Sequence, residues 1–472
     1  MPVHIIRKRG LLIALTATAF LAGCASFSPG GGLEKVAAIT QERAAVSPSR
    51  IITEEDSARV ADEVKRLLRE PLTAETAVKI AILNNRGLQA NLASLGIAEA
   101  ELVQASRLRN PGFTFTRLSG GGVSEIERQF LFDVLGLLTL PTRTEIERRR
   151  FETVQIKVAG EVLRLAQQTR QAFFSAVAAR QAAGYMETVR EAAGAGAELA
   201  GRMAGIGNFS RLRANREQLL AAELTAELTR ARQNATQQRE RLTRLMGLTG
   251  KERDFRLPER LPDLPANLIP EQDIQRQAMS SRLDIRMARL ELEGLAKSLG
   301  LTRATRFVNV LEVSYLNADA DGEPDKRGYE IELALPIFDW GEARTVKAES
   351  LYNQAMHRVA EIAVNAESEV NESYAAYRAA HELAGRYRDE IVPLARQISE
   401  ENLLRYNGML IGVWELLADT RAQVTSVNAS IQALRDFWLA ESNLQISLNS
   451  GGAGSQMLTV GAASAADAGG GH

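Results

Sequence analysis

The sequence has 472 residues, and its 57 lysine and arginine residues against 58 aspartate and glutamate residues give a formal net charge of −1. A balance this close to neutral gives no electrostatic reason to expect a nucleic-acid partner. Aromatic residues make up 5% of the chain, which is low for a compact enzyme and consistent with helices that pack through alanine, leucine and valine.

The first residues have the pattern of an export signal. Arg7, Lys8 and Arg9 form a positive segment, residues 11–20 are apolar, and small residues follow. An apolar run of about ten residues is too short to cross a bilayer as a helix, so we expect cleavage rather than retention as an anchor. Residues 1–23 contain these three basic residues and no acidic ones, so their removal changes the formal net charge from −1 to −4.

The only cysteine of the chain, Cys24, directly follows the predicted export signal. Residues 21–24 resemble the lipobox of bacterial lipoproteins, in which the cysteine becomes the lipidated first residue of the mature chain. The alternative is a chance cysteine, but a lone free thiol is unusual in a protein exported to an oxidising compartment. In the lipoproteins that it resembles, Ala25 favours transfer to the outer membrane. A single acyl chain anchors only marginally, so we expect further membrane contact.

The rest of the chain is predicted to be duplicated. Residues 24–71 are expected to form a tether and a short helix, and residues 72–250 and 269–448 to form two repeats joined by a linker at 251–268. The repeats are offset by about 197 residues, since Ala81 and Leu88 recur as Ala278 and Ile285 in a second opening helix. The Gly-, Ala- and Ser-rich tail at 449–472 is expected to be disordered.

Each repeat has a predicted strand pair after its opening helix. The first β-hairpin, at 112–135, places Phe113 and Phe115 on one face of its first strand. The second, at 307–336, has an acidic loop at 317–328. The apolar positions of the remaining strands alternate with polar ones, and they are Phe130, Phe132, Val134, Leu311, Val313, Tyr315, Tyr329, Ile331, Leu333 and Leu335. This period of two predicts strands with one apolar and one polar face, a pattern that soluble half-buried strands share.

Each repeat then continues as a predicted long helical hairpin, at 144–247 and at 343–448. Apolar residues recur at helical spacings, and they are Val154, Val158, Val162, Leu165, Ala172, Ala176, Ala179 and Ala183 in the first copy and Ala355, Val359, Ile362, Ala366, Val370, Tyr377, His381 and Ala384 in the second. Such stripes occur in tube walls and in solid bundles alike. A helix of about 60 residues spans about 90 Å, roughly three times the hydrocarbon thickness of a bilayer, so it must project into water.

Four strands are too few to close a membrane barrel, and open sheet edges are not tolerated in lipid. Copies of the chain must therefore pool their strands. Two chains would supply eight strands and three would supply twelve, both of which are known barrel sizes. Twelve strands leave more room for a lumen.

Four local patterns occur in a fixed order along the two predicted repeats. They are Asn84, Asn85, Leu88 and Gln89 in the opening helix, Asn110 and Pro111 before the first strand, residues 335–341 after the last strand, and residues 405–408 with Leu416 and Leu417 before the final helix. Over 71–448 this order resembles the TolC-like outer membrane efflux proteins. The resemblance implies a mainly α fold with a small transmembrane β part.

The resemblance also implies an assembly and a route. Three identical chains would form one twelve-stranded barrel in the outer membrane and one tunnel of twelve helices in the periplasm, through which substrates pass chemically unchanged. A periplasmic adaptor would dock on the helical tips and connect the channel to an inner-membrane pump. The first tip, at 205–210, lacks the acidic residue often found after the glycine in the family, so it departs from the family pattern for adaptor contacts.

Two groups of candidate site residues lie near the predicted tips. Glu415 and Asp419 are four residues apart on one helical face, where like charges are mildly destabilising. Three copies would form carboxylate rings at a pore constriction, whereas the alternative is a solvated face beside Arg421. The second group comprises possible adaptor contacts that could equally be tip packing, namely Gly205, Phe209, Gly408 and Trp414.

No cofactor, metal site or catalytic cluster is expected. His381 lies on an apolar stripe, typical of a packed histidine, and His357 is 24 residues away from it. The acidic loop at 317–328 is interpreted as a solvated surface loop rather than an ion site. Two non-enzyme alternatives remain, a periplasmic adaptor lipoprotein and a non-channel coiled-coil scaffold. The sequence does not identify the transported cargo.

Overall fold

The computed structural model describes residues 26–120, 123–271, 274, 281–308, 310–408, 410–411 and 413–451, with side chains left out at 413–418. The chain forms two compact units. Unit 1 contains the described residues of Met1–Val36, Asn91–Val158 and Ile285–Ile362, and unit 2 contains those of Ala37–Ala90, Ala159–Asp284 and Ala363–His472. The export signal, Cys24 and nearly all of the tail lie outside the described residues.

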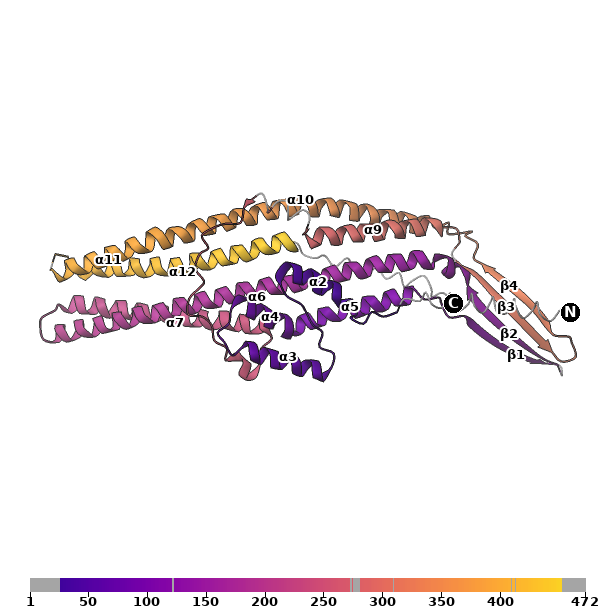
Figure 1. The fold of residues 1–472 in the computed structure, drawn as a ribbon, viewed down its shortest axis with the longest axis horizontal. Coiled ribbons are helices and arrows are strands. Elements are labelled where there is room, and N and C mark those ends of the chain that lie inside the picture. The colour runs from indigo at the N-terminus through magenta and orange to yellow at the C-terminus, as the bar shows by residue number, and fades with distance from the viewer. Residues whose placement is uncertain are drawn as a thin grey trace. The chain divides into compact units, whose positions relative to one another are not determined.

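Most described residues are helical, and the helices flank a small sheet in sequence (Figure 1). The helices are α2 (Leu33–Ala44), α3 (Glu54–Leu67), α4 (Ala74–Asn84), α5 (Arg86–Ala105), α6 (Val134–Gly205), α7 (Arg211–Met246), α9 (Leu283–Ala304), α10 (Glu342–Arg386), α11 (Val392–Asn407) and α12 (Val413–Asn449), with a 3₁₀ turn η1 (Gly250–Arg253) and a π turn η2 (Tyr387–Ile391). Among the described residues, none of these helices is both long and apolar enough to cross a membrane.

The sheet belongs to unit 1 and joins strands from the two predicted repeats. Its strands are β1 (Gly112–Gly120), β2 (Val123–Asp133), β3 (Leu311–Ala320) and β4 (Lys326–Leu333), in the order β1-β2-β3-β4. All three pairings are antiparallel, and β2 of the first repeat pairs with β3 of the second. The two predicted hairpins therefore form one four-stranded sheet.

The second hairpin has a shorter loop than its acidic residues predicted. Residues 317–320 continue β3, because they pair with residues 125–128 of β2, and β4 already begins at Lys326. The remaining connection is 321–325. Sequence alone could not show this, since the pairing partner comes from the other repeat.

Helix α6 begins earlier than residue 144. It starts at Val134, which was predicted to be a strand residue, and it contains Pro141. Asp133 ends β2 and starts the helix, because its Oδ1 accepts a hydrogen bond of 2.6 Å from the backbone N–H of Gly136. A side-chain acceptor at this position satisfies one of the free N–H groups of the first turn.

The opening helix of the first repeat is broken rather than continuous. Asn85 lies between α4 and α5 in an extended conformation, with φ −70° and ψ 117°. Asn84 Nδ2 donates to the carbonyl of Gly247 over 2.8 Å, and Asn85 Nδ2 donates to that of Leu245 over 2.9 Å. The two side chains thereby satisfy carbonyls that the C-terminus of α7 leaves free.

The second long helix contains one local irregularity. The π turn η2 separates α10 from α11 and ends just before Pro393. Proline lacks an N–H and its ring clashes with the carbonyl four residues earlier, so a widened turn lets the helix continue.

Six of the eight residues of the first predicted helical stripe and four of the eight of the second are buried. Val158, Val162, Leu165, Ala172, Ala176 and Ala179 of the first stripe and Ala366, Val370, Tyr377 and Ala384 of the second are below 10% exposure. In unit 2, Phe437 of α12 is fully buried against Tyr377, whose ring centroid lies 5.4 Å away. A second cluster joins Met186 of α6, Leu224 of α7 and Val424 of α12.

Candidate functional site in the sheet and the helical turns

One face of the sheet carries a row of aromatic side chains across all four strands. The register pairs Phe113 with Phe130, Phe130 with Tyr315, and Tyr315 with Tyr329. Their exposed fractions are 57%, 43%, 46% and 77%, and the rings of Phe113 and Phe130 lie 4.9 Å apart. We call this side of the sheet the aromatic face. Exposed aromatic rows of this kind mark surfaces that contact another apolar medium or protein.

We call the opposite side of the sheet the polar face. On this face, side-chain hydrogen bonds connect β2, β3 and β4. Gln129 Nε2 on β2 donates to Ser314 Oγ over 2.8 Å and to Glu330 Oε2 over 2.9 Å. Ser314 Oγ also donates to Glu330 Oε2 over 3.3 Å. One amide, one hydroxyl and one carboxylate therefore connect three strands on a surface suited to water.

Charge is also divided between the two faces. The strand register places six acids and one lysine on the polar face, namely Glu125, Glu127, Asp133, Glu312, Glu330, Glu332 and Lys326. The strands themselves carry a net charge of −5 on this side, counted over those seven residues. A lumen lined by such strands would attract cations.

Both outer strands leave one edge without a partner. Strand β1 pairs only with β2, and β4 pairs only with β3, within the described sheet. An unpaired edge presents a row of free backbone N–H and C=O groups, which is a template for adding another strand.

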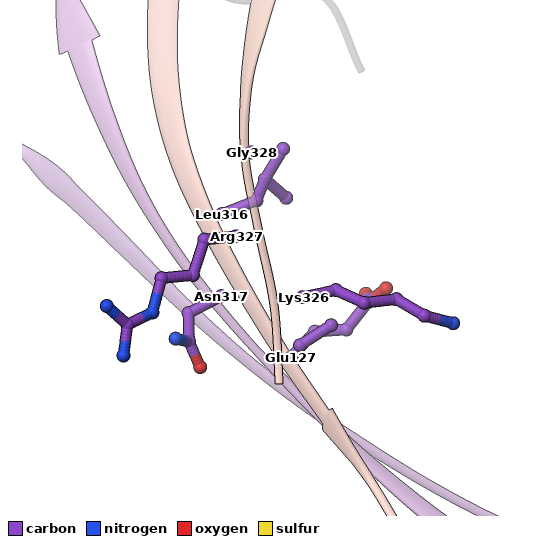
Figure 2. Close-up of a pocket in the computed structure, with 7 residues that line it drawn as sticks. Glu127, Leu316, Asn317, Lys326, Arg327 and Gly328 are labelled. Atoms are coloured by element: carbon purple, nitrogen blue, oxygen red, sulfur yellow. The ribbon is translucent and has the colours of Figure 1, made fainter. Parts of the chain in front are cut away.

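A hollow of about 250 Å³ lies around the loop end of β3 and β4. Figure 2 shows Asn317 and Arg327 on one side of the β4 ribbon and Glu127 and Lys326 on the other. Its lining comes from both faces of the sheet, so it differs from the enclosed apolar cavity typical of a small-molecule site.

The first helical turn is built around glycine and a capped helix start. Gly205 is the last residue of α6, and Gly207 adopts φ +83°, a conformation that favours glycine. Ser210 caps α7 by accepting a hydrogen bond from the backbone N–H of Arg213. Phe209 is half-buried, with the guanidinium carbon of Arg213 6.0 Å from its ring centre.

The second turn begins at Gly408, whose N–H donates to the carbonyl of Leu404 over 3.0 Å at the end of α11. The side chains of Trp414 and Glu415 lie outside the described residues. Asp419 is half-buried, and its Oδ2 accepts a hydrogen bond from Asn402 Nδ2 of α11. Two residues on, Arg421 forms an ion pair with Glu223 of α7 over 2.7 Å.

The sequence interpretation did not single out Asn402 or Glu223. Glu223 and Arg421 are 198 residues apart, close to the repeat offset of about 197, so nearly equivalent positions of the two return helices face each other. A search for charges of opposite sign at the repeat offset could have found this pair.

Burial shifts the pKa of two carboxyl groups in the helical hairpins of unit 2. Burial raises the pKa of Glu217 on α7. It also raises the pKa of Glu441 on α12, although Arg170 and a hydrogen bond from Gln445 oppose the shift.

The remaining polar candidates have structural partners. His381 Nε2 lies 2.9 Å from the carbonyl oxygen of Pro265, and its ring packs edge-on against Phe437, as expected for a packed histidine. In the loop after β3, Asp321 Oδ2 accepts from the N–H of Ser124, and Glu323 pairs with Lys326 over 2.6 Å. Within the described part of the chain, no group of three or more His, Cys, Asp or Glu side chains could hold a metal ion.

Comparison with known proteins identifies the architecture. No family model and no curated protein matches the chain. A crystal structure of CusC, described for its transmembrane channel formation, superposes with a TM-score of 0.68 at 17% identity, over 82% of this chain and 94% of CusC. The open-state MtrE outer membrane channel of Neisseria gonorrhoeae gives 0.67 at 16% identity, over 80% and 89%. The CmeC outer membrane channel of Campylobacter jejuni gives 0.65 at 14% identity, over 91% and 93%.

The chain has the outer membrane channel fold. The mainly helical architecture with a small sheet, inferred from the resemblance to TolC-like proteins, is thus confirmed. Identities of 14–17% with these structures establish the fold alone. The aromatic face and the polar face are therefore the residue-level basis for any functional proposal.

Proposed function

We propose that this protein is the outer membrane channel component of a tripartite efflux or secretion system. The single observation that carries the proposal is the four-stranded sheet with two unpaired edges and an exposed aromatic face, in a chain with the outer membrane channel fold. An open sheet cannot remain in lipid because its edge N–H and C=O groups would have no partner. Association with identical chains removes both edges.

The proposed assembly is a homotrimer. Pairing β1 of one copy with β4 of the next would close a barrel of twelve strands. The aromatic face would then contact the outer membrane lipid and the polar face would line the lumen. The helical hairpins of three chains would supply the twelve helices of a periplasmic tunnel, through which substrates diffuse without chemical change.

Lipidation at Cys24 is proposed as a second membrane attachment. The lipobox-like residues 21–24 support it, and acyl chains such as palmitate would add to the contact made by the sheet. Replacement of Cys24 by alanine, followed by mass spectrometry of the mature N-terminus, tests this proposal. An unmodified Cys24 in the wild-type protein would refute it.

The two helical turns are the proposed docking sites for a periplasmic adaptor, which would connect the channel to an inner-membrane pump. Two aliphatic side chains at the turns, Ile206 and Leu410, are 73% and 74% exposed, which supports a contact surface there. Gly205, Phe209, Gly408 and Trp414 are the proposed contact residues.

Glu415 and Asp419 are proposed to contribute carboxylate rings to a pore constriction. The hydrogen bond between Asp419 and Asn402 links α12 to α11 at this level and would orient the carboxylate. Replacing Glu415 with Gln and Asp419 with Asn should change cation block and single-channel conductance in planar bilayers. Unchanged values would remove the constriction proposal while leaving the channel proposal intact.

The main experiment is the oligomeric state and conductance of the purified protein. A heat-modifiable trimer that forms single channels in planar bilayers is expected. A stable monomer without conductance would contradict the proposal and favour the alternative of a non-channel coiled-coil scaffold. The other alternative, a periplasmic adaptor lipoprotein, has less support because two strand pairs and two helical hairpins are present.

A further inference from the structure

The arginines of the sheet lie on the aromatic face, opposite the acids. The strand register places Arg117, Arg128 and Arg327 on this face together with one acid, Asp319, among the described strand residues. The six acids of the strands other than Asp319 all lie on the polar face. The arginines are therefore separated by the sheet itself from most carboxylates that could neutralise them.

Two of these arginines, Arg128 and Arg327, lie in one row across the strands, next to the aromatic row. The row next to Phe113, Phe130, Tyr315 and Tyr329 towards the hairpin loops reads Phe115, Arg128, Asn317 and Arg327 across the four strands. Arg117 follows two residues beyond Phe115 on β1. Successive rows on one face are about 7 Å apart, since each strand residue advances the chain by about 3.4 Å.

The arginine row is oriented and accessible. Arg128 Nη1 donates to Asn317 Oδ1 over 3.3 Å, which holds this guanidinium along the sheet surface. Arg117 and Arg327 are exposed. Figure 2 shows Arg327 and Asn317 extending to the same side of β4, away from Lys326 and Glu127.

The position and chemistry of the row identify a ligand. In membrane proteins, aromatic belts lie at the level of the lipid headgroups, and arginine on a lipid-facing strand is costly in the bilayer centre but tolerated at the interface. The planar guanidinium matches phosphate oxygens with two parallel hydrogen bonds. We propose that Arg117, Arg128 and Arg327 bind the phosphate groups of anionic lipid headgroups in the leaflet around the hairpin loops.

This inference rests on the proposed function, because it requires the aromatic face to contact lipid. The test uses the full-length protein purified in detergent and native mass spectrometry to count bound lipid. The probes are bisphosphorylated lipid A and the same lipid with both phosphates removed. The variant is Arg128→Gln with Arg327→Gln, and the control is Lys326→Gln, which removes one positive charge from the residue next to Arg327 but on the polar face.

The wild-type protein is expected to bind the phosphorylated lipid at least tenfold more tightly than the dephosphorylated one. The double arginine variant should lose this preference, and Lys326→Gln should change it less than twofold. A second double variant, Arg128→Lys with Arg327→Lys, keeps both positive charges but lacks the planar guanidinium. It should bind the phosphorylated lipid more weakly than the wild type, and it provides a test that does not depend on the folding of the double glutamine variant.

Three results would overturn the inference. They are equal binding of the two lipids by the wild type, an unchanged preference in the double variant, and an equal loss in Lys326→Gln. Conductance in planar bilayers separates this failure from failure of the proposed function. A wild-type protein that conducts but does not distinguish the lipids refutes only the lipid site, whereas a non-conducting monomer refutes the channel.

Discussion

Arg421 Nη2 lies 2.7 Å from Glu223 Oε2, and this ion pair joins α12 of the second repeat to α7 of the first. Both side chains are about half exposed, at 48% and 50%. A pair so accessible to water contributes about 0–1 kcal/mol to stability. The pair links two return helices of unit 2, and one of them, α12, carries the residues of the proposed constriction.

We expect Arg421→Gln to raise single-channel conductance, because the two helices then move apart more readily, and to change the midpoint of thermal unfolding little. Arg435→Gln is the matched control, since Arg435 pairs with its own neighbour Asp436 on α12. Equal conductance in both variants and the wild type would show that the Arg421–Glu223 pair does not restrain the proposed tunnel.

Arg282 is a buried charge with two acidic partners. Its side chain is 1% exposed, and its Nη2 donates to Asp284 over 2.5 Å and to Glu369 over 2.8 Å. Removing one partner of a buried pair leaves an uncompensated charge, so Arg282→Ala should destabilise the protein by about 3–5 kcal/mol. Thermal unfolding followed by circular dichroism measures this loss.

Arg303→Ala is the control for Arg282. Arg303 pairs with Glu349 over 2.6 Å, but the two side chains are 59% and 41% exposed. Its loss should therefore cost about 0–1 kcal/mol. Similar destabilisation by both substitutions would contradict the role assigned to burial.

Glu441 should make stability depend on pH. Burial raises the pKa of Glu441 in the folded state above its ordinary value of 4.5. Between the unfolded pKa and the folded pKa, the folded protein therefore binds more protons than the unfolded chain. Its contribution is fully favourable below about pH 4.5, the unfolded pKa, and is lost as pH rises through the folded pKa.

Glu441→Gln cannot ionise, so we expect it to unfold at a higher temperature than the wild type at pH 8 and at a similar temperature at pH 4. Glu227→Gln, at an exposed position of α7, should show no such pH-dependent gain. A constant difference between Glu441→Gln and the wild type at every pH would argue against the raised pKa.

Gly247 is required for a close approach as well as for its backbone conformation. It has φ +67°, and a Cβ there would lie 2.8 Å from the carbonyl oxygen of Asn84. Gly207 has φ +83°, but a Cβ there would have nothing within 4 Å. A left-handed conformation costs a residue with a Cβ about 1–2 kcal/mol.

Gly207→Ala should therefore lower stability by about that amount, and Gly247→Ala should lower it further because the backbone of Asn84 must also move. Differential scanning calorimetry of the two variants checks the order. A smaller effect at Gly247 than at Gly207 would mean that the contact with α4 is readily displaced.

The sequence was sufficient to predict helices and strands wherever apolar side chains recur with a regular period over many residues. The buried positions Val158, Val162 and Ala172 follow from helical spacing, and the aromatic face follows from the alternation at Phe113 and Phe115. It was insufficient where an element depends on a distant partner. Asn85 was expected within a helix but lies between two: its Oδ1 accepts a local hydrogen bond from the N–H of Leu88, and its Nδ2 donates to the distant carbonyl of Leu245 of α7.

The candidate site shows the same division. Asp419 was identified from its spacing to Glu415, but its hydrogen bond to Asn402 required the fold to bring α11 against α12. The partners Glu223 and Arg421 each look like ordinary solvated charges in sequence.

The sequence by itself determined the long helices and the amphipathic strands, because periodicity of side chains along one element is a local property. Only the tertiary structure decided that β2 pairs with β3, and that the three strand arginines lie on the face opposite to all strand acids except Asp319. Strand pairing depends on backbone hydrogen bonds between segments far apart in the chain, and face assignment depends on the resulting register.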